Sequence, residues 1–307
     1  MQKSTIKIIL IYAVACMMWG STWMAIRVSL NSLTPFVSCG LRFLLASFFV
    51  IALVKIRGIK IQTDKLSMTL YLVMGLFSFV IPFGLVYWGE QYVPSGLASV
   101  LFAVNPFFVA IFSYYFIVNE NVGAHKIIGI VLGFAGILII FSENILGDIK
   151  IYIPGMLAII GSAIMQGGLQ VTMKKHGGHL NPLSMNFLPM LFAGVVMLGF
   201  GLLVEDTSRL VFDLSAYLSV GYLAFFGSLV TFTSYYWLLK RVSVVVLSLI
   251  AFITPIIALI LGWVFLDEEL SSRHVIGSLI VLTGLLIAIL GNFRSLKKIK
   301  LLKKQAV

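Results

Sequence analysis

Few side chains in this sequence could do chemistry, and Arg42 is the clearest of them because it lies inside an apolar run. It stands about eight residues into that run, roughly 12 Å deep at 1.5 Å per residue if the run is helical. A guanidinium at that depth could receive the carboxylate of a small solute through two hydrogen bonds. Alternatively, Arg42 pairs with helix-end carbonyls or a neighbouring acid and holds the fold together.

A second charged candidate, Glu90, follows Tyr87 and Trp88 at the end of another apolar run. In a partly dry cavity its pKa would rise, and the carboxyl group could then take up and release a proton. The other interpretation is an exposed interfacial acid without a role.

Aromatic and amide side chains inside the apolar runs form a third group of candidates. Rings with a polar atom can line a cavity and stack on a planar or cationic solute, and a buried amide needs several hydrogen-bond partners. Trp88, Tyr236 and Trp237 could instead belong to the aromatic belt found at membrane interfaces. The polar residues could instead form hydrogen bonds between helices. The residues expected to line a cavity are Trp19, Ser21, Arg42, Tyr87, Asn105, Gln166, Ser234 and Tyr235.

The sequence contains little that would indicate a metal site or a cofactor site. His176 and His179 flank two glycines beside Lys174 and Lys175, without a third ligand nearby, so we predict no metal site. No phosphate loop, nucleophile motif or paired acids stand out, and we predict no cofactor. The two cysteines lie in apolar runs and are expected to be buried thiols.

The composition indicates which kind of structure must position these residues. Of 307 residues, 60% are hydrophobic and only 11% are charged, against about 45–50% and about 25% in soluble proteins. Such a chain cannot cover a water-facing surface, so a soluble enzyme is excluded. Ten crossings of about 20 residues would use about 200 residues and leave no room for a separate soluble domain. We therefore predict an all-α membrane protein.

Ten apolar runs are long enough to cross a bilayer, and they must be helices because lipid offers no partners to backbone polar groups. The run at 126–142 is the shortest, and the first is expected to stay in the protein because it is too long for a signal peptide. The predicted spans are 7–26, 34–54, 67–89, 94–118, 126–142, 152–173, 182–204, 215–238, 242–266 and 273–292.

The cations orient these spans. With both chain ends on one side, that side holds seventeen of the 22 Lys and Arg residues and the other side holds four. Because cytoplasmic segments collect Lys and Arg, both termini are predicted to be cytoplasmic in the inner or plasma membrane. The basic tail at 293–307 is read as a contact with anionic lipid and not with nucleic acid.

The two halves of the chain resemble each other at separations of 147 to 149 residues. We assign 1–146 to a first five-helix repeat and 147–292 to a second. Five is an odd number, so the second copy enters the membrane from the opposite side, an arrangement that recurs in secondary transporters. The matched pairs are Gly20 and Gly167, Pro35 and Pro182, Tyr87 and Tyr236, Pro106 and Pro255, Glu120 and Glu268, Gly129 and Gly277, and Gly136 and Gly284.

Small residues and prolines recur within this pattern. Pro106 and Pro255 fall midway along the fourth and ninth spans, where each is expected to kink a helix and act as a hinge or packing element. Glycines on the fifth and tenth spans would let these two helices approach closely and hold the halves together. They are Gly129, Gly133, Gly136, Gly277 and Gly284.

These motifs resemble the EamA-type branch of the drug/metabolite transporter superfamily over about residues 8 to 292. The chain opens with Trp19-Gly20-Ser21, followed by Arg27, Pro35 and Arg42, and each half ends with a Pro, an acid and a Gly at similar spacing. The resemblance implies a ten-helix fold with cytoplasmic termini and export of small metabolites, commonly amino acids or their derivatives. The second copy departs from the pattern, with Gln166 at the position of Trp19.

We therefore expect a secondary transporter, monomeric and not an enzyme, that works by alternating access, either downhill or coupled to protons. An importer or a drug-efflux protein of the same fold is an alternative. A membrane-embedded enzyme for lipid substrates is another, although it should carry clustered acids or histidines at membrane depth, and nine of the eleven acids lie in segments outside the membrane.

Overall fold

The computed structural model describes residues 3–116, 123–144, 149–181, 183–239, 241 and 250–305. This part of the chain is all-helical and holds ten apolar helical segments. Seven are long enough to cross a membrane, and three shorter ones cover Ile127–Ile140, Ile253–Leu266 and Ser272–Ala288. The prediction of an all-α membrane protein with ten spans is confirmed. Residues 242–249, the predicted start of the ninth span, lie outside the described residues, as do Glu120 and Pro182.

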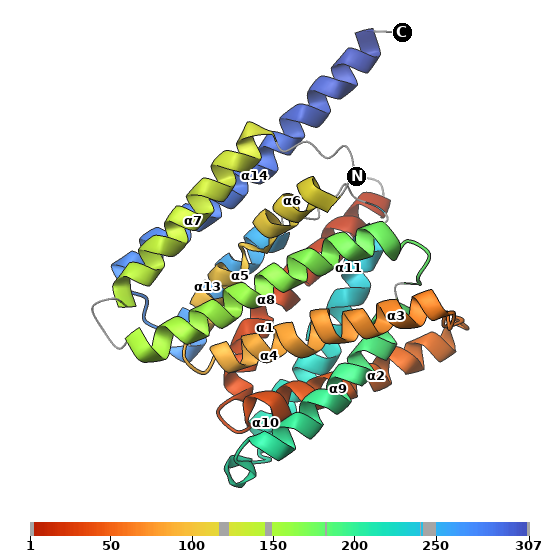
Figure 1. Cartoon of the computed structure of the whole chain (residues 1–307), viewed down its shortest axis with the longest axis vertical. Coiled ribbons are helices and arrows are strands. Elements are labelled where there is room, and N and C mark those ends of the chain that lie inside the picture. Colours follow the sequence, from red (N-terminus) through yellow and green to blue (C-terminus); the bar gives the residue numbers. More distant parts are fainter. Residues whose placement is uncertain are drawn as a thin grey trace.

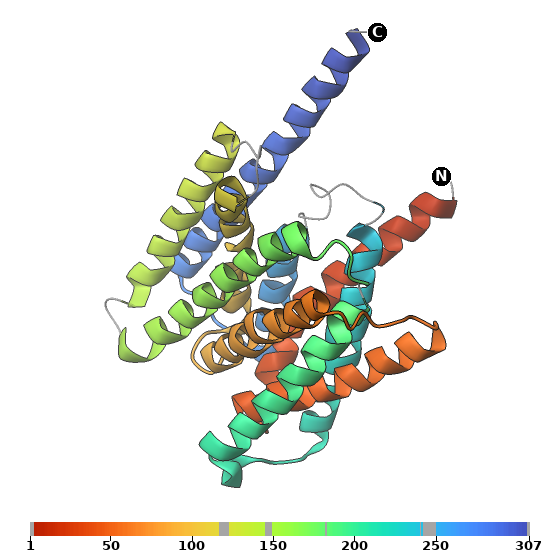
Figure 2. The same cartoon turned by 45° about the vertical axis from the view of Figure 1, so that its right-hand side comes forward.

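The elements follow one another as antiparallel rods, with both chain ends at the same end of the bundle (Figures 1 and 2). We call this end the terminal face and the other the opposite face. In order they are α1 Lys3–Ser29, α2 Pro35–Ile56, α3 Lys65–Met74, η1 Gly75–Val80, α4 Ile81–Gly89, α5 Ser95–Phe102, α6 Asn105–Phe116, α7 Ala124–Asn144, α8 Ile149–His176, α9 Ser184–Val204, η2 Thr207–Arg209, α10 Leu214–Ala224, η3 Phe225–Val230, α11 Thr231–Leu239, α13 Ile250–Leu266 and α14 Ser272–Gln305.

The fourth span differs from the prediction of a kinked helix. It is broken: α5 ends at Phe102, and α6 begins at Asn105 with Pro106 in its first turn. A proline there loses no hydrogen bond, because the first N–H groups of a helix have no internal partner. Pro255, by contrast, lies inside α13, which continues through it.

The third and eighth spans each contain a π-helical turn, and neither turn was predicted from the sequence. η1 joins α3 to α4, and η3 joins α10 to α11, exactly 150 residues later in the chain. In η3 the hydroxyl of Ser228 donates to the carbonyl of Leu223, and that of Thr231, the first residue of α11, donates to the carbonyl of Phe226, each five residues back. These hydroxyls occupy carbonyls that the wide turn displaces. Such turns are rare and concentrate at functional sites.

The packing repeats with the sequence. The first span packs against the ninth as the sixth packs against the fourth, and the second pairs with the seventh. Gly20 of α1 lies against Thr254 and Ile257 of α13, while Gly167 of α8 lies against Asn105 and Phe108 of α6. These partners are 149 residues apart in sequence. The same contact is therefore made twice, once by each copy.

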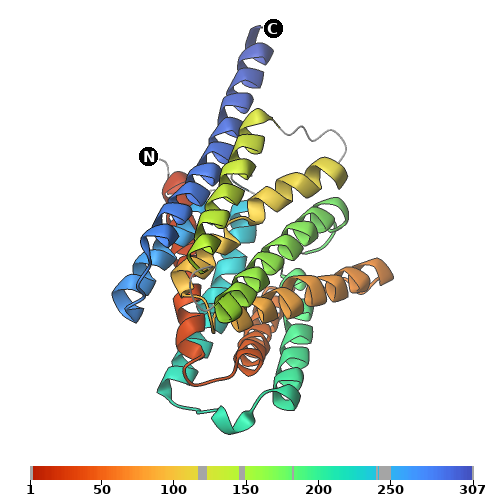
Figure 3. The ribbon, with the colours of Figure 1, turned by 60° about the vertical axis from the view of Figure 1, so that its left-hand side comes forward.

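Helices α7 and α14 lie side by side along one flank of the bundle (Figures 1 and 3). Their glycines meet backbone to backbone: a Cβ on Gly129 would come 2.6 Å from the carbonyl oxygen of Gly284, and one on Gly136 would come 2.6 Å from that of Gly277. The reverse contacts are equally close. Only glycine permits this approach, so these residues join the two copies. Gly133 faces the ring of Phe107 on α6 instead.

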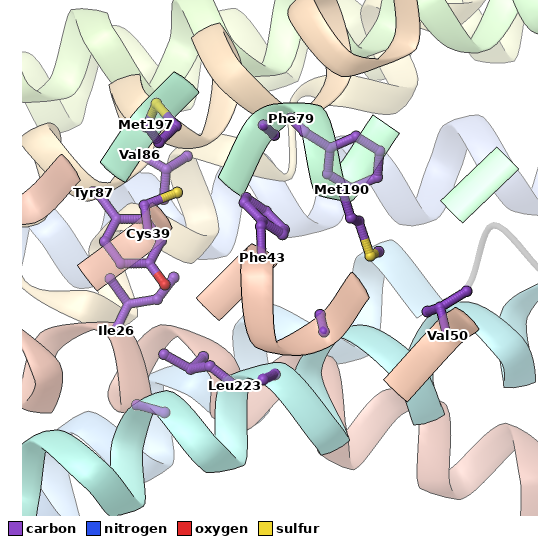
Figure 4. Packing of buried hydrophobic residues seen from close by; sticks show 14 of the residues in the cluster. Ile26, Cys39, Phe43, Val50, Phe79, Val86, Tyr87, Met190, Met197 and Leu223 are labelled. Carbon is purple, nitrogen blue, oxygen red and sulfur yellow. The ribbon is translucent and has the colours of Figure 1, made fainter. Parts of the chain in front are cut away.

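One large apolar core of the described residues lies between α1, α2, α4, α9, α10 and the η1 turn (Figure 4). Phe43 of α2 and Phe79 of η1 meet edge to face, with ring centroids 5.2 Å apart. Tyr87 of α4 is fully buried in the same cluster beside Cys39. Arg42, the chain neighbour of Phe43, lies beside this core and begins the first group of polar residues described below.

Candidate functional site

Arg42 lies in the middle of α2 with only 2% of its surface exposed. Its Nε donates to the hydroxyl of Ser228 at 3.2 Å, and its Nη1 donates to the Tyr87 hydroxyl at 3.4 Å. The guanidinium lies over the ring of Phe83, 5.0 Å from its centroid. These partners are neutral, so the hydrogen bonds leave the positive charge of Arg42 without a directly bonded anion. A buried cation of this kind favours an anionic ligand.

The η3 turn shapes the space beside Arg42. A Cβ on Gly227 would come 3.4 Å from Nη2 of the guanidinium and 2.8 Å from Thr22 of α1. Because glycine lacks this atom, the arginine lies directly against the turn. Arg42 therefore ties the first repeat to the π-turn of the second.

A second network lies around α8. Gln166 donates to the carbonyl of Ser78 in η1 and accepts from the Ser78 hydroxyl, both at 3.2 Å. Asn105 donates to the carbonyl of Ala163 at 2.8 Å and accepts from Gln170 at 3.2 Å. Gln166 thus ties the second repeat to the π-turn of the first. Each π-turn is held through its serine by a side chain of the other repeat.

A third group joins α1 to the eighth span. The ring of Trp19 contacts Tyr235 at 5.3 Å and Phe232 at 5.8 Å between centroids. The hydroxyl of Ser21 lies 2.6 Å from that of Tyr222. Ser234 is half-buried next to Tyr235 on α11.

Phe79 links the three groups. Its ring contacts Phe43, the neighbour of Arg42, and also contacts Phe232, which in turn contacts Trp19. Its chain neighbour Ser78 belongs to the Gln166 network. The rings of Phe43, Phe79 and Phe232 thus form an aromatic layer that connects the groups of Arg42, Trp19 and Gln166. Arg42 contacts Tyr87 directly and Trp19 contacts Tyr235 directly, whereas Asn105 and Gln166 belong to the separate network on α8.

Four residues of these groups were not predicted from the sequence: Ser78, Phe79, Tyr222 and Ser228. One signal was present: Ser78 and Ser228 are 150 residues apart, one position beyond the separations used to match the repeats. Phe79 and Tyr222 gave none, because buried aromatic residues are common in apolar spans.

Glu90 is fully buried, so the interpretation as an exposed interfacial acid was wrong. Among the described residues, neither oxygen of its carboxyl group has a hydrogen-bond partner. Arg27, in the last turn of α1, donates from Nη1 to the backbone carbonyl of Glu90. The Glu90 carboxyl also interacts electrostatically with Arg27, Arg42 and Glu268. It therefore lies within electrostatic range of two arginines, near the opposite face.

Two other acids join the repeats at the opposite face. Glu205, after α9, accepts from the backbone N–H groups of Phe36 and Val37 at 2.9 and 3.1 Å. Glu268, after α13, accepts from those of Ser95 and Gly96 at 2.7 and 3.0 Å. Each carboxylate of the second repeat thus caps the N-terminus of a helix in the first. A negative charge there is favoured by the helix dipole.

We expect Glu268→Gln to lower the free energy of unfolding by about 2 kcal/mol, because an amide replaces a charge-assisted acceptor with a neutral one and turns an NH₂ group toward N–H donors. The matched control is Glu269→Gln, since Glu269 is exposed and its loss should change stability by less than about 0.5 kcal/mol. Thermal unfolding of the purified protein in detergent measures both. Equal effects would contradict the capping role.

Of the basic residues in the described loops, Arg57, Lys60 and Arg241 lie at the terminal face and Arg209 lies at the opposite face. Arg241 and Lys7 lie over the ring of Trp237, at 4.0 and 5.6 Å from its centroid. His179 lies 3.1 Å from the hydroxyl of Ser67. Within the described residues no three His, Cys, Asp or Glu side chains gather as metal ligands would, and both cysteines are free thiols. The side chain of Tyr236 lies outside the described part.

Two interlocked copies of an apolar helical unit, with polar networks where they meet, define a duplicated membrane protein of the transporter class. The chain matches the model of the EamA-like transporter family twice, over residues 6–142 and 153–290. It therefore belongs to this family, which makes it a membrane transporter and not an enzyme. The resemblance found in the sequence motifs is confirmed.

Several named proteins are similar over most of their length. The uncharacterized inner membrane transporter YedA of Escherichia coli K12 is 30% identical over 90% of this chain and 88% of its own. The uncharacterized transporter YoaV of Bacillus subtilis is 26% identical over 91% and 96%, and the protein PagO of Salmonella typhimurium is 28% identical over 84% of each. One crystal structure, at 19% identity, shares the fold with a TM-score of 0.70 over 94% of this chain and 98% of its own.

Proposed function

We propose that this protein is a secondary transporter that exports small metabolites, such as amino acids or their derivatives, by alternating access. The observation that carries the proposal is Arg42: a buried cation, held by two neutral hydroxyls at the junction of the repeats. A guanidinium in this state suits a solute carboxylate, which it can bind through two parallel hydrogen bonds. The aromatic layer around Phe79 supplies apolar surface for the rest of the solute.

In this proposal the lining residues are those predicted from the sequence, with Ser78, Phe79 and Ser228 added. The repeats at 1–146 and 147–292 exchange their packing, and the π-turns η1 and η3 are the paired hinges, with the helix break at Pro106 and the proline at Pro255 as further bending points. A solute that binds Arg42 competes with Ser228 for the guanidinium, and so loosens the contact that holds η3. Binding of the solute to Arg42 is thereby linked to bending of the eighth span at η3.

The proposed orientation places the terminal face in the cytoplasm and the tail at 293–307 on anionic lipid, with the protein acting as a monomer in the inner or plasma membrane. The excess of Lys and Arg on the terminal face supports it. Reporter tags in the loops at 57–64 and 205–213 test it. We expect them on opposite sides of the membrane, and tags on the same side would overturn the inverted arrangement.

We also propose that Glu90 carries the coupling proton. Its carboxyl group is buried, is without a hydrogen-bond partner among the described residues, and interacts electrostatically with Arg27 and Arg42. A carboxyl group so placed changes its interactions with both arginines when it gains or loses a proton.

The experiment is uptake of each of the twenty common amino acids into proteoliposomes, with and without an imposed pH gradient. We expect at least one amino acid to move and the gradient to stimulate its uptake. In Glu90→Gln, stimulation by the gradient should be lost while exchange of labelled for unlabelled solute continues. If no amino acid moves, the substrate class is wrong. If Glu90→Gln still responds to the gradient, Glu90 is not the coupling group.

A further inference from the structure

A cavity of about 370 Å³ opens on the opposite face, at the seam between the two repeats. Its volume falls within the range of about 300–1,000 Å³ that small-molecule sites occupy. The first repeat contributes Arg27, Asn31 and Tyr92 to its wall, and the second contributes Tyr152, Asp267 and Glu268. A solute that leaves the junction of the repeats toward this face meets these residues.

The charged side chains of the cavity differ in how many of their hydrogen-bonding atoms already have a partner in the protein. Both oxygens of Glu268 accept backbone N–H groups of α5. The Asp267 side chain is exposed, and within the described part of the chain it has no hydrogen bond or ion pair. Arg27 donates one N–H to the carbonyl of Glu90, and a guanidinium carries five such donors. The guanidinium of Arg27 and the carboxylate of Asp267 can therefore still form hydrogen bonds with a ligand. These two residues come from different repeats.

Asp267 also has an unusual backbone conformation, with a φ of 51°. This left-handed region is uncommon for most residues other than glycine, although aspartate is enriched there, and it is a common conformation for the residue that ends a helix. The conformation directly follows the end of α13 at Leu266 and places Asp267 on the cavity wall next to the capping residue Glu268. The fold thus places Glu268 on the N-terminus of α5 and Asp267 at the opening of the cavity.

We propose that this cavity is a second binding site for the transported solute, with Arg27 receiving the carboxylate and Asp267 the ammonium group of an α-amino acid. The tyrosine rings of Tyr92 and Tyr152 contact the remainder. The inference rests on the proposed function and narrows it, because a site with both charges selects zwitterions over simple carboxylic acids. Glu90 interacts electrostatically with Arg42 of the central site and with Arg27 of the opposite-face site.

The test uses Asn31→Cys in the full-length purified protein. Asn31 is an exposed residue of the cavity wall, whereas the native Cys16 and Cys39 are buried. A membrane-impermeant thiol reagent should therefore label position 31, and bound amino acid should protect it. Each of the twenty common amino acids is added in turn, together with the deaminated acid and the decarboxylated amine of any that protects. A cysteine at the exposed Thr207, outside the cavity wall, is the control and should stay unprotected.

We expect protection by the zwitterion alone, and a rise of at least tenfold in the half-protecting concentration when Asp267→Asn is added. Glu269→Gln, an exposed neighbouring acid, should leave it unchanged. Arg42→Lys weakens the central site and should also leave protection in place, which separates direct binding from closure driven from the centre. Absent protection, equal protection by the deaminated acid, or protection that Asp267→Asn leaves intact would each overturn the proposal. Because labelling requires no transport, these outcomes are independent of the uptake assay.

Discussion

Replacing Arg42 by lysine is expected to lower transport about 10- to 100-fold, since a charged group loses one well-placed hydrogen bond worth about 1.5–3 kcal/mol and tenfold corresponds to about 1.4 kcal/mol. Lysine keeps the positive charge but not the planar fork that binds a carboxylate through two bonds. The loss should appear in the half-saturating concentration as well as in the rate. Initial rates of uptake into proteoliposomes measure both.

The matched control for this variant is Arg57→Lys, because Arg57 is an exposed residue of the loop after α2. It should transport as the unchanged protein does. Thermal unfolding of both variants separates loss of the site from loss of the fold. If Arg42→Lys is folded and transports normally, Arg42 is part of the scaffold, which is the alternative that its position in an apolar run left open.

The helices were predictable because apolar length and charge placement decide them with little help from tertiary structure. The predicted boundaries of the first three spans lie within four residues of those of α1, of α2 and of the continuous run from α3 to α4. The break at Pro106 was not predicted, since proline in a run of apolar residues fits a kink and a new helix start equally well. The continuous helix around Pro255 shows that the same residue in the matched position can do either.

The candidate site was predictable only in part. Polar residues in apolar spans are few, so Arg42, Asn105 and Gln166 could be found by type alone. Their partners could not, because Ser78 and Ser228 become acceptors and donors only where a π-turn meets the other repeat. Glu90 was misjudged for a related reason: its burial depends on segments distant in sequence, since Arg27 of α1 binds its carbonyl and α8 packs against Gly89 at the end of α4.

Shortening a π-turn should slow the exchange of conformations while leaving the bundle folded. A π-turn holds one residue more than an α-helix needs, so deleting one residue can restore an α-helix and keep the register on both sides. Phe77 in η1 and Phe226 in η3 suit this purpose, because both are about two-fifths exposed, at 42% and 40%. Neither deletion removes the serines that Gln166 and Arg42 contact.

We expect each deletion to lower the rate of solute exchange at least tenfold and the double deletion to abolish it. The reason is that a regular helix satisfies the carbonyls that the wide turn leaves to Ser228 and Thr231, and it therefore resists bending. The length-preserving variants Phe77→Leu and Phe226→Leu are the controls and should retain exchange. Spin-label distances between the loops at 57–64 and 177–183 report on opening of the terminal face. A folded double deletion that still populates both distances and still exchanges solute would show that the hinges lie elsewhere, at the helix break by Pro106 first of all.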